Sequence, residues 1–499
     1  MDYEKAYREQ QHMLASMAAS IAGLTQQNAK LVAKVDELTD MLAKKLRRRK
    51  RTPAKPVVVS DLSNADIADR PSPPALPPKP ERQAKTGYRT GRKPLPEHLD
   101  VVSKKLTPTA CKRCGGTSLR IVDQVVSEKL THVRAHVKRA VTTRVTCACN
   151  ECLTRTTAVA PPAPYSRSKV DSAFLAWLCY QKYGLHLPLD RIRRELRDQG
   201  VVLAESFLVS LIERAAGLLE GVDGAHWKQL MAGPHLHTDG SGLPVVVPKA
   251  GTHRGVVDVF AWDEIAVFQY ATRKNGADLA AKLTGFSGTL VADAESRLNR
   301  IYAELDVLEA GCNAHGRRKF RNAEGAQPEL AAEGGQFIAA VYTQERLATE
   351  QGLTGPDLLA HRQAHHAPIV ADFRQWLDVL LPKLLPSDPL AKAARYYDNH
   401  WTALTRFLTD PSLPLDNNLS ERLLRPLALG RNNWMFAGST EGAHRAMVLM
   451  GIVATCRRTK VDPVAYMAWA FDRLGTRRKR DGHTASGSTP AIFRKKTEQ

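Results

Sequence analysis

The stretch HLHTDGSGLPVVVP, residues 235–248, begins the part of the chain that decides the fold. Two similar stretches follow it, HRGVVDVFAWD at 253–263 and IAVFQYATRK at 265–274, with turn residues between them. Runs of β-branched and aromatic residues that are separated by turn residues predict consecutive strands. A meander of three strands is therefore expected over residues 235–274.

Helices and strands alternate after this meander. The sequence predicts a helix at 276–286, a buried strand at 288–295, a helix at 296–306, and a last strand that enters a basic helix at 309–320. Three meandering strands followed by alternating helices and strands is the order of the ribonuclease H-like fold. Residues 330–408 are helical by their apolar period, which predicts an insertion in that fold.

Two carboxylates stand where predicted strands end. Asp239 is expected at the end of the first strand or in its turn, and Asp293 at the end of the fourth. These strands are neighbours in a ribonuclease H-like sheet, so the two acids should lie side by side. Such acids repel each other unless a cation separates them. Mg²⁺ or Mn²⁺ suits carboxylate ligands and leaves room for phosphate oxygens.

A third carboxylate comes from LPLDNNLSERLLRPLALGRNNWMFAG, residues 413–438. A short helix should begin at Asn417 or Asn418, with Asp416 as its cap, and should carry Glu421. Three acids would complete a two-metal site for phosphoryl transfer. Basic and polar residues near these acids are candidate contacts to DNA: Arg317, Arg318, Lys319, Arg425, Arg431, Asn433 and Trp434.

Each acid also has an ordinary interpretation. Asp239 begins DGSG, which is typical of a turn. Asp293 could cap the next helix. Glu421 could form a weak surface ion pair with Arg425. Their occurrence together, in this order of strands and helices, favours catalysis.

The charge of the chain favours an anionic polymer as partner. Lys and Arg total 72 against 51 acids, which gives a net charge of +21 and a pI of about 9.7. Nucleic acid is the expected partner, and a soluble protein with basic tails is the alternative. No secretory signal or membrane-spanning apolar run is visible, and the cysteines do not form a disulfide pattern. We expect a cytoplasmic, nucleoid-associated protein with no membrane partner.

The N-terminal region predicts self-association. Residues 14–42 carry apolar residues at alternating spacings of three and four, interrupted by Asn28. This heptad pattern predicts a coiled-coil helix within residues 1–46, and thus a homodimer or higher oligomer. An amphipathic helix that packs on its own domain is the alternative. Residues 47–106 are basic and proline-rich and predict an extended linker.

Residues 107–155 predict a zinc ribbon. Cys111 and Cys114 form one Cys-x-x-Cys pair, and Cys149 and Cys152 form a second, which is the spacing of thiolates around a tetrahedral Zn²⁺. Cys147 is expected to be the spare cysteine, although the choice between it and Cys149 is open. Buried thiols without metal are the alternative.

The segment HVRAHVKRAV, residues 132–141, lies between these pairs. It alternates apolar and basic residues, so it predicts a strand that turns Arg134 and Lys138 towards DNA. Residues 156–228 are helical. A helix, a glycine and a second helix in this segment suggest a helix-turn-helix, with an ordinary helical hairpin as the alternative.

Several motifs resemble the insertion sequence sixty-six transposases. They are GRKPLPEHL at 91–99, the paired cysteine knuckles, KYGLHLPLDRI at 182–192, GCNAHGRRKF at 311–320, LDNNLSERLLRPLALGRNNWMFAGSTEGAHRA at 415–446 and VDPVAYM at 461–467. The likeness runs from about residue 14 to about residue 473. It departs from the family at DGSG, where many relatives have Glu-Thr after the first aspartate.

The resemblance implies a transposase with an Asp-Asp-Glu triad at Asp239, Asp293 and Glu421. It implies a core of residues 229–328 and 411–473, a helical insertion at 329–410, and a Cys-x-x-His pair, Cys312 and His315, near the active site. We interpret that pair as a buried thiol and a backbone-bonded histidine rather than a metal site. The tail, residues 474–499, matches nothing in the family and predicts a basic disordered segment.

The expected function is transposition of DNA. Mg²⁺ or Mn²⁺ at the triad would serve cleavage at the ends of the element and strand transfer into target DNA, while Zn²⁺ would hold the ribbon. Companion proteins of the same element are further candidate partners. Two alternatives are a catalytically inactive DNA-binding regulator derived from a transposase, and a metal-dependent nuclease that cuts without joining.

Overall fold

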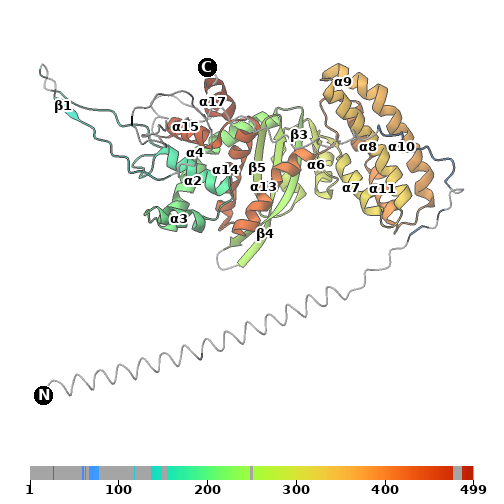
Figure 1. Cartoon of the computed structure of the whole chain (residues 1–499), viewed down its shortest axis with the longest axis horizontal. Coiled ribbons are helices and arrows are strands. Elements are labelled where there is room, and N and C mark those ends of the chain that lie inside the picture. The colour runs from blue at the N-terminus through green and yellow to red at the C-terminus, as the bar shows by residue number, and fades with distance from the viewer. Residues whose placement is uncertain are drawn as a thin grey trace.

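The computed structural model describes residues 26, 59–60, 62, 67–77, 117, 136–148, 150, 154–247, 251–475 and 486–497 (Figure 1). The predicted coiled coil, apart from Gln26, lies outside these residues. So do the four predicted zinc ligands, Arg134 and most of the predicted linker. Within the described ranges, every helix is too short or too polar to cross a lipid bilayer.

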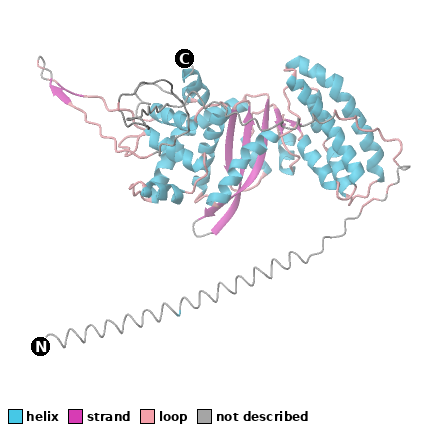
Figure 2. Cartoon of the chain, viewed as in Figure 1, coloured by secondary structure: helices cyan, strands magenta, loops and turns pink. Residues whose placement is uncertain are grey.

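A mixed sheet of five strands forms the centre of the molecule (Figure 2). Its order is β5–β4–β3–β6–β7, and its strands are β3 His235–Val247, β4 Gly251–Trp262, β5 Ile265–Ala271, β6 Thr289–Val291 and β7 Leu308–Ala310. The first three are antiparallel, and β6 and β7 run parallel to β3. The predicted meander and the adjacency of the first and fourth strands are therefore confirmed.

One face of the sheet is covered by long helices, because the strands alternate apolar side chains towards them. Leu243, Val257 and Val259 pack against Leu424 and Leu427 in this core. The helices on this side are α2 Ser172–Tyr183, α3 Leu189–Asp198, α4 Glu205–Met231, α13 Asn418–Trp434, α14 Thr440–Arg458 and α15 Pro463–Leu474. Asp171, Ser439 and Asp462 cap α2, α14 and α15 by accepting hydrogen bonds from first-turn N–H groups.

The predicted helix-turn-helix corresponds to α3 and α4. Gly200, which has a positive φ of 79°, lies in the connection between them, where a residue with a Cβ would be strained. The two predicted helices are thus present, and recognition of DNA by them stays a prediction.

The opposite face of the sheet is covered by shorter elements. They are α5 Gly276–Lys282, the 3₁₀ turn Ser296–Leu298 and α6 Asn299–Glu304. Leu236, Phe260 and Leu290 pack against Leu279 and Ile301 there. The sheet is therefore buried on both faces, as a sheet with crossover helices must be.

The predicted insertion is all-helical and has its own core. Its elements are α8 Pro328–Glu350, α9 Gly355–His361, the π-helix Arg362–His366, α10 Ala367–Leu380, the 3₁₀ turn Leu381–Lys383, α11 Pro389–Asn399, α12 Trp401–Thr405 and the 3₁₀ turn Arg406–Leu408. Phe337, Phe373 and Trp376 are its central aromatic residues, and Phe320 of α7 (Asn313–Ala323) joins them. Figure 1 shows these helices beside the β7 edge of the sheet.

Part of the predicted linker is bound to the insertion rather than free. Ile67 is buried in the core of the insertion, and the backbone N–H of Ser60 donates to Asp388 Oδ2 at 2.8 Å. Arg70 donates two hydrogen bonds to Glu333, each of 2.8 Å. Residues 71–77 form no helix or strand, and an apolar anchor and a bidentate ion pair attach the segment before them to the domain.

This attachment can be tested by proteolysis. Ile67→Ala removes buried methyl groups, so the segment should open more often. Endoproteinase Asp-N should then cut before the exposed Asp69 faster by about tenfold, since cleavage follows the open fraction. Leu76→Ala is the control, because Leu76 is 40% exposed and should leave the rate unchanged. Equal rates in all three proteins would show that the contact of Ile67 does not hold the segment.

The predicted basic strand needs correction. Residues 136–145, which include its described part, form no strand, and Val137 and Val141 are exposed, so the alternation buries no apolar face. Lys138 is exposed. A two-stranded hairpin comes after this segment, β1 Thr146–Ala148 and β2 Arg155–Thr157, with Cys147 exposed in β1.

The predicted disorder of the tail is wrong for its described residues. Helix α17, Pro490–Thr497, packs Phe493 against Tyr466 and Trp469 of α15. Arg494 also pairs with Glu264 at 2.9 Å. One aromatic residue and one ion pair thus bind a tail whose composition alone favoured disorder.

Candidate active site

The pairing of β3 with β6 determines where the two aspartates lie. His237 is opposite Val291 in this parallel pair. Asp239 and Asp293 each follow two residues later, so both lie at the same level along the two neighbouring strands. Asp293 lies two residues beyond the end of the short strand β6, while Asp239 lies inside the longer strand β3.

The stretch DGSG is strand, not turn, which corrects the prediction that the first strand ends at Asp239. Arginine side chains lie against Gly240 and Gly242, in the space that a Cβ would take. A Cβ at Gly240 would lie 2.3 Å from Arg297 Nη2, and one at Gly242 would lie 2.3 Å from Arg254 Nε. The glycines that suggest a turn thus admit two guanidinium groups against the strand.

Helix α13 brings Glu421 to the same place. The bond expected of Asp416 is present, since its Oδ1 accepts from the N–H of Asn418 at 3.0 Å, but the N-cap residue is Asn417, whose side chain makes no capping bond. Tyr342 of the insertion donates to Asp416 Oδ2 at 2.8 Å and so holds this carboxylate in place. The helix runs to Trp434, far beyond the short helix that the sequence predicted.

One histidine lies between two of the three acids. His315 Nε2 lies 3.3 Å from Asp293 Oδ2 and 3.5 Å from Glu421 Oε1. Burial raises the pKa of Asp239, and the nearby carboxylates of Glu421 and Asp293 raise it further, while the Gly240 N–H and His315 oppose them. Asp239 is therefore within electrostatic range of both other acids, and a single site shared by all three stays a prediction.

The same site suits a hard divalent cation. Glu421 Oε1 is buried and has no hydrogen-bond partner among the described residues. A buried carboxylate oxygen without a donor is costly, and a cation would satisfy it. Asp293, with 41% of its side chain exposed, leaves the site open to a ligand. Carboxylate oxygens are the ligands that Mg²⁺ or Mn²⁺ prefers, so Glu421 and Asp293 suit such an ion, and its binding by all three acids stays a prediction.

The Cys-x-x-His pair lies against the acids. Cys312 is fully buried, as predicted, and burial raises the pKa of its thiol to about 11. The prediction for His315 is wrong, because its Nε2 faces the acids and its Nδ1 has no hydrogen-bond partner in the described part of the chain. Ligand atoms of Cys312, His315 and Glu421 lie within 4.8 Å of one another, so together they could hold a softer ion.

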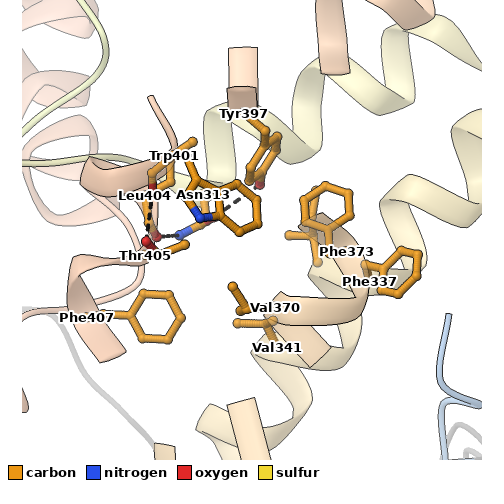
Figure 3. A pocket seen from close by; sticks show the side chains of 11 residues that line it. Asn313, Phe337, Val341, Val370, Phe373, Tyr397, Trp401, Leu404, Thr405 and Phe407 are labelled. Atoms are coloured by element: carbon orange, nitrogen blue, oxygen red, sulfur yellow. Dashed lines mark hydrogen bonds between the residues drawn. The ribbon is translucent and has the colours of Figure 1, made fainter. Parts of the chain in front are cut away.

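Asn313, between these two residues, attaches α7 to the insertion. Its Nδ2 donates to the carbonyls of Leu404 and Leu415, at 3.0 and 3.1 Å, and its Oδ1 accepts from Tyr397 at 3.1 Å. Figure 3 shows Asn313 at the edge of an apolar cavity of about 20 Å³. That volume admits one water molecule and no substrate, so the cavity belongs to the core.

The candidate DNA contacts fall into two groups. Arg317, Arg318, Lys319 and Arg425 are exposed on α7 and α13. Arg318 Nη2 lies 3.6 Å from Glu421 Oε1, so Glu421 faces His315 and Arg318 instead of the expected Arg425.

The second group lies at the end of α13 and is engaged with the fold. Arg431 donates to the carbonyl of Gly242, and Asn433 donates to that of His186 at 3.2 Å. Trp434 is partly buried against the core. These three residues therefore stabilise the fold at the end of α13, in addition to any contact that they make with DNA.

Sequence reasoning missed Asn417 and the pair of Asp258 with Arg297. Asn417 was visible only as a possible first residue of the helix, and its side-chain partners lie more than 100 positions away. Asp258 was visible as an acid within the apolar run VVDVFAW, which should have marked a buried charge that needs a partner.

Comparison with known proteins identifies the family. Residues 167–445, more than half of the chain, match the family described as Transposase IS66 family. The chain therefore belongs to this family. It is also similar to two proteins of Sinorhizobium fredii, both described as uncharacterized. Protein y4hP is 28% identical over 78% of this chain and 75% of its own length, and y4jD is 26% identical over 76% and 78%. All three acids lie within the matched range.

Proposed function

We propose that the protein is an active transposase that cuts DNA at the ends of its element and joins them to target DNA. The observation that supports this most is the convergence of Asp239, Asp293 and Glu421 around His315. The strand order matches that of the ribonuclease H-like fold, in which such acids hold metal ions. Family membership makes transposition the expected use of the site.

The two steps need no covalent enzyme intermediate. In the first, a water oxygen attacks the phosphorus at the end of the element, the bond from phosphorus to the 3′-oxygen breaks, and a 3′-hydroxyl is released. In the second, this hydroxyl attacks a phosphorus of target DNA and displaces a new 3′-oxygen. When bound, divalent ions held by the three carboxylates would activate the attacking oxygen and balance the charge of the leaving oxygen.

The protein side chains would orient the DNA. Arg317, Lys319 and Arg425 present exposed charges on the two helices that carry His315 and Glu421. Phosphate contacts fix register and orientation on a duplex, which is what an in-line attack requires. The proposed coiled coil would pair two protomers so that both ends of the element are held together, and the proposed Zn²⁺ ribbon would add a second DNA contact.

An assay with labelled element ends, Mg²⁺ and a target plasmid tests the proposal. Joined product supports a transposase. End binding without Mg²⁺-dependent nicking would indicate the regulator, and nicking without joining would indicate the nuclease.

The contribution of α7 to DNA binding can be measured separately. Arg317→Ala removes one exposed charge. The plot of the logarithm of the binding constant for the labelled ends against the logarithm of the salt concentration should therefore become less steep, by about 1. Arg346→Ala is the control, because Arg346 lies in the insertion and pairs with Glu350 at 3.8 Å. An unchanged slope for Arg317→Ala would remove α7 from the DNA interface.

A further inference from the structure

A single buried amide lies where the elements of the candidate site meet. Asn417, directly before α13, is 0% exposed. We infer that Asn417 is a positioning residue that holds Asp239 and Glu421 at the separation that metal binding requires. This inference rests on the proposed function, because it assigns Asn417 a role towards the proposed metal ions.

The side chain of Asn417 binds the strand that carries Asp239. Its Nδ2 donates to the carbonyl of Thr238 at 2.7 Å, and Thr238 is the residue before Asp239. Its Oδ1 lies 3.0 Å from His237 Nδ1. An amide oxygen can only accept, so the His237 Nδ1–H donates to it.

The backbone of Asn417 binds the other two elements. Its N–H donates to Cys312 Sγ at 3.2 Å, at the start of the helix that carries His315. Its carbonyl accepts from the N–H of Glu421 at 3.4 Å, in the first turn of α13. One residue thus contacts the strand of the first acid, the turn of the third acid and the start of α7.

The geometry requires an amide in particular. The side chain must donate to one group and accept from another, and both partners are buried. Aspartate has the same shape, but it would place an oxygen against the Thr238 carbonyl, and the two would repel. A ligand carboxylate depends on such supporting bonds, and their removal typically weakens metal binding by about 10–100-fold.

Asn418 offers a matched control. It has the same side chain at the next position, and its Nδ2 donates to Asp416, within the same turn. Asn418→Ala therefore removes a local bond at the start of α13 without touching β3 or α7.

The experiment measures Mn²⁺ binding by electron paramagnetic resonance in the full chain without DNA. The Asp293→Asn variant defines the signal that does not belong to the site. Asn417→Asp should weaken the Mn²⁺ affinity by about tenfold or more and raise the Mg²⁺ concentration for half-maximal nicking by a similar factor. Saturating Mg²⁺ should restore the nicking rate, and end binding should not change. Asn418→Ala should behave as wild type.

The outcomes separate the inference from the proposed function. If wild type binds Mn²⁺ and nicks DNA but Asn417→Asp lowers only the melting temperature, Asn417 is structural and the inference fails. If wild type neither binds Mn²⁺ at this site nor nicks DNA, the proposed function fails and the inference falls with it. Should Asn417→Asp not fold, Asn417→Ser, which removes the amide without adding a charge, is measured in the same way, and wild-type affinity in that variant overturns the inference.

Discussion

Replacing any one of Asp239, Asp293 and Glu421 with its amide should reduce nicking and strand transfer by about 10³-fold or more. Each amide keeps the shape of the side chain and removes a negative ligand. Metal ions supply several kcal/mol of transition-state stabilisation, and each 1.36 kcal/mol corresponds to a factor of about ten in rate. The measurement is the rate of joined product from labelled ends at fixed Mg²⁺ concentration.

End binding provides the necessary contrast. The exposed basic side chains that would contact phosphate are not altered in these variants. The affinity of the protein for the element ends should therefore stay at the wild-type level. Asp278→Asn is the matched control, because Asp278 is an exposed acid on α5, across the sheet from Glu421. Substantial strand transfer by any triad variant would refute the assignment of that residue. Loss of end binding in all three would instead indicate a structural role.

The sequence could predict those parts of the fold that depend on local pattern. Each strand of the meander and each helix can be recognised from its own segment, by the periodicity of its apolar residues or by a run of them. The same holds for the helical insertion. The adjacency of β3 and β6 followed from that order, and with it the proximity of Asp239 and Asp293. Glu421 was found through a motif on one helix.

Contacts between distant segments could not be predicted. Ile67 is buried beneath helices more than 250 positions away, and nothing in its own segment distinguishes it from a linker residue. The strand through Gly240 was mistaken for a turn because its partner, Arg297, lies far along the chain. His315 was placed near the acids, but the direction of its ring depends on three elements at once.

Asp258 and Arg297 form the buried ion pair whose loss should destabilise the fold most. Asp258 is 1% exposed and lies opposite Gly240 in β4, and Arg297 Nη2 donates to its Oδ1 at 2.6 Å. Burial alone would lower the pKa of Arg297, but Asp258 and Glu295 outweigh this and raise it. The pair thus holds the 3₁₀ turn after Asp293 against the back of the strand that carries Asp239.

Arg297→Ala should lower the free energy of unfolding by about 3–5 kcal/mol, because it leaves the Asp258 carboxylate buried with only Lys282 nearby, at 3.9 Å. Urea unfolding measures this loss.

The control and the second variant separate charge burial from packing. Arg300→Ala removes a neighbouring arginine whose partner, Glu304, is about half exposed, so it should cost only about 0–1 kcal/mol. The double variant Asp258→Ala with Arg297→Ala removes both charges. Its loss in free energy of unfolding should be smaller than the sum of the losses in the two single variants. Additive losses would show that Arg297 stabilises the turn by packing alone. The pair would then be no more than a neighbour of the candidate site, rather than the contact that fixes Gly240 and the strand of the first acid.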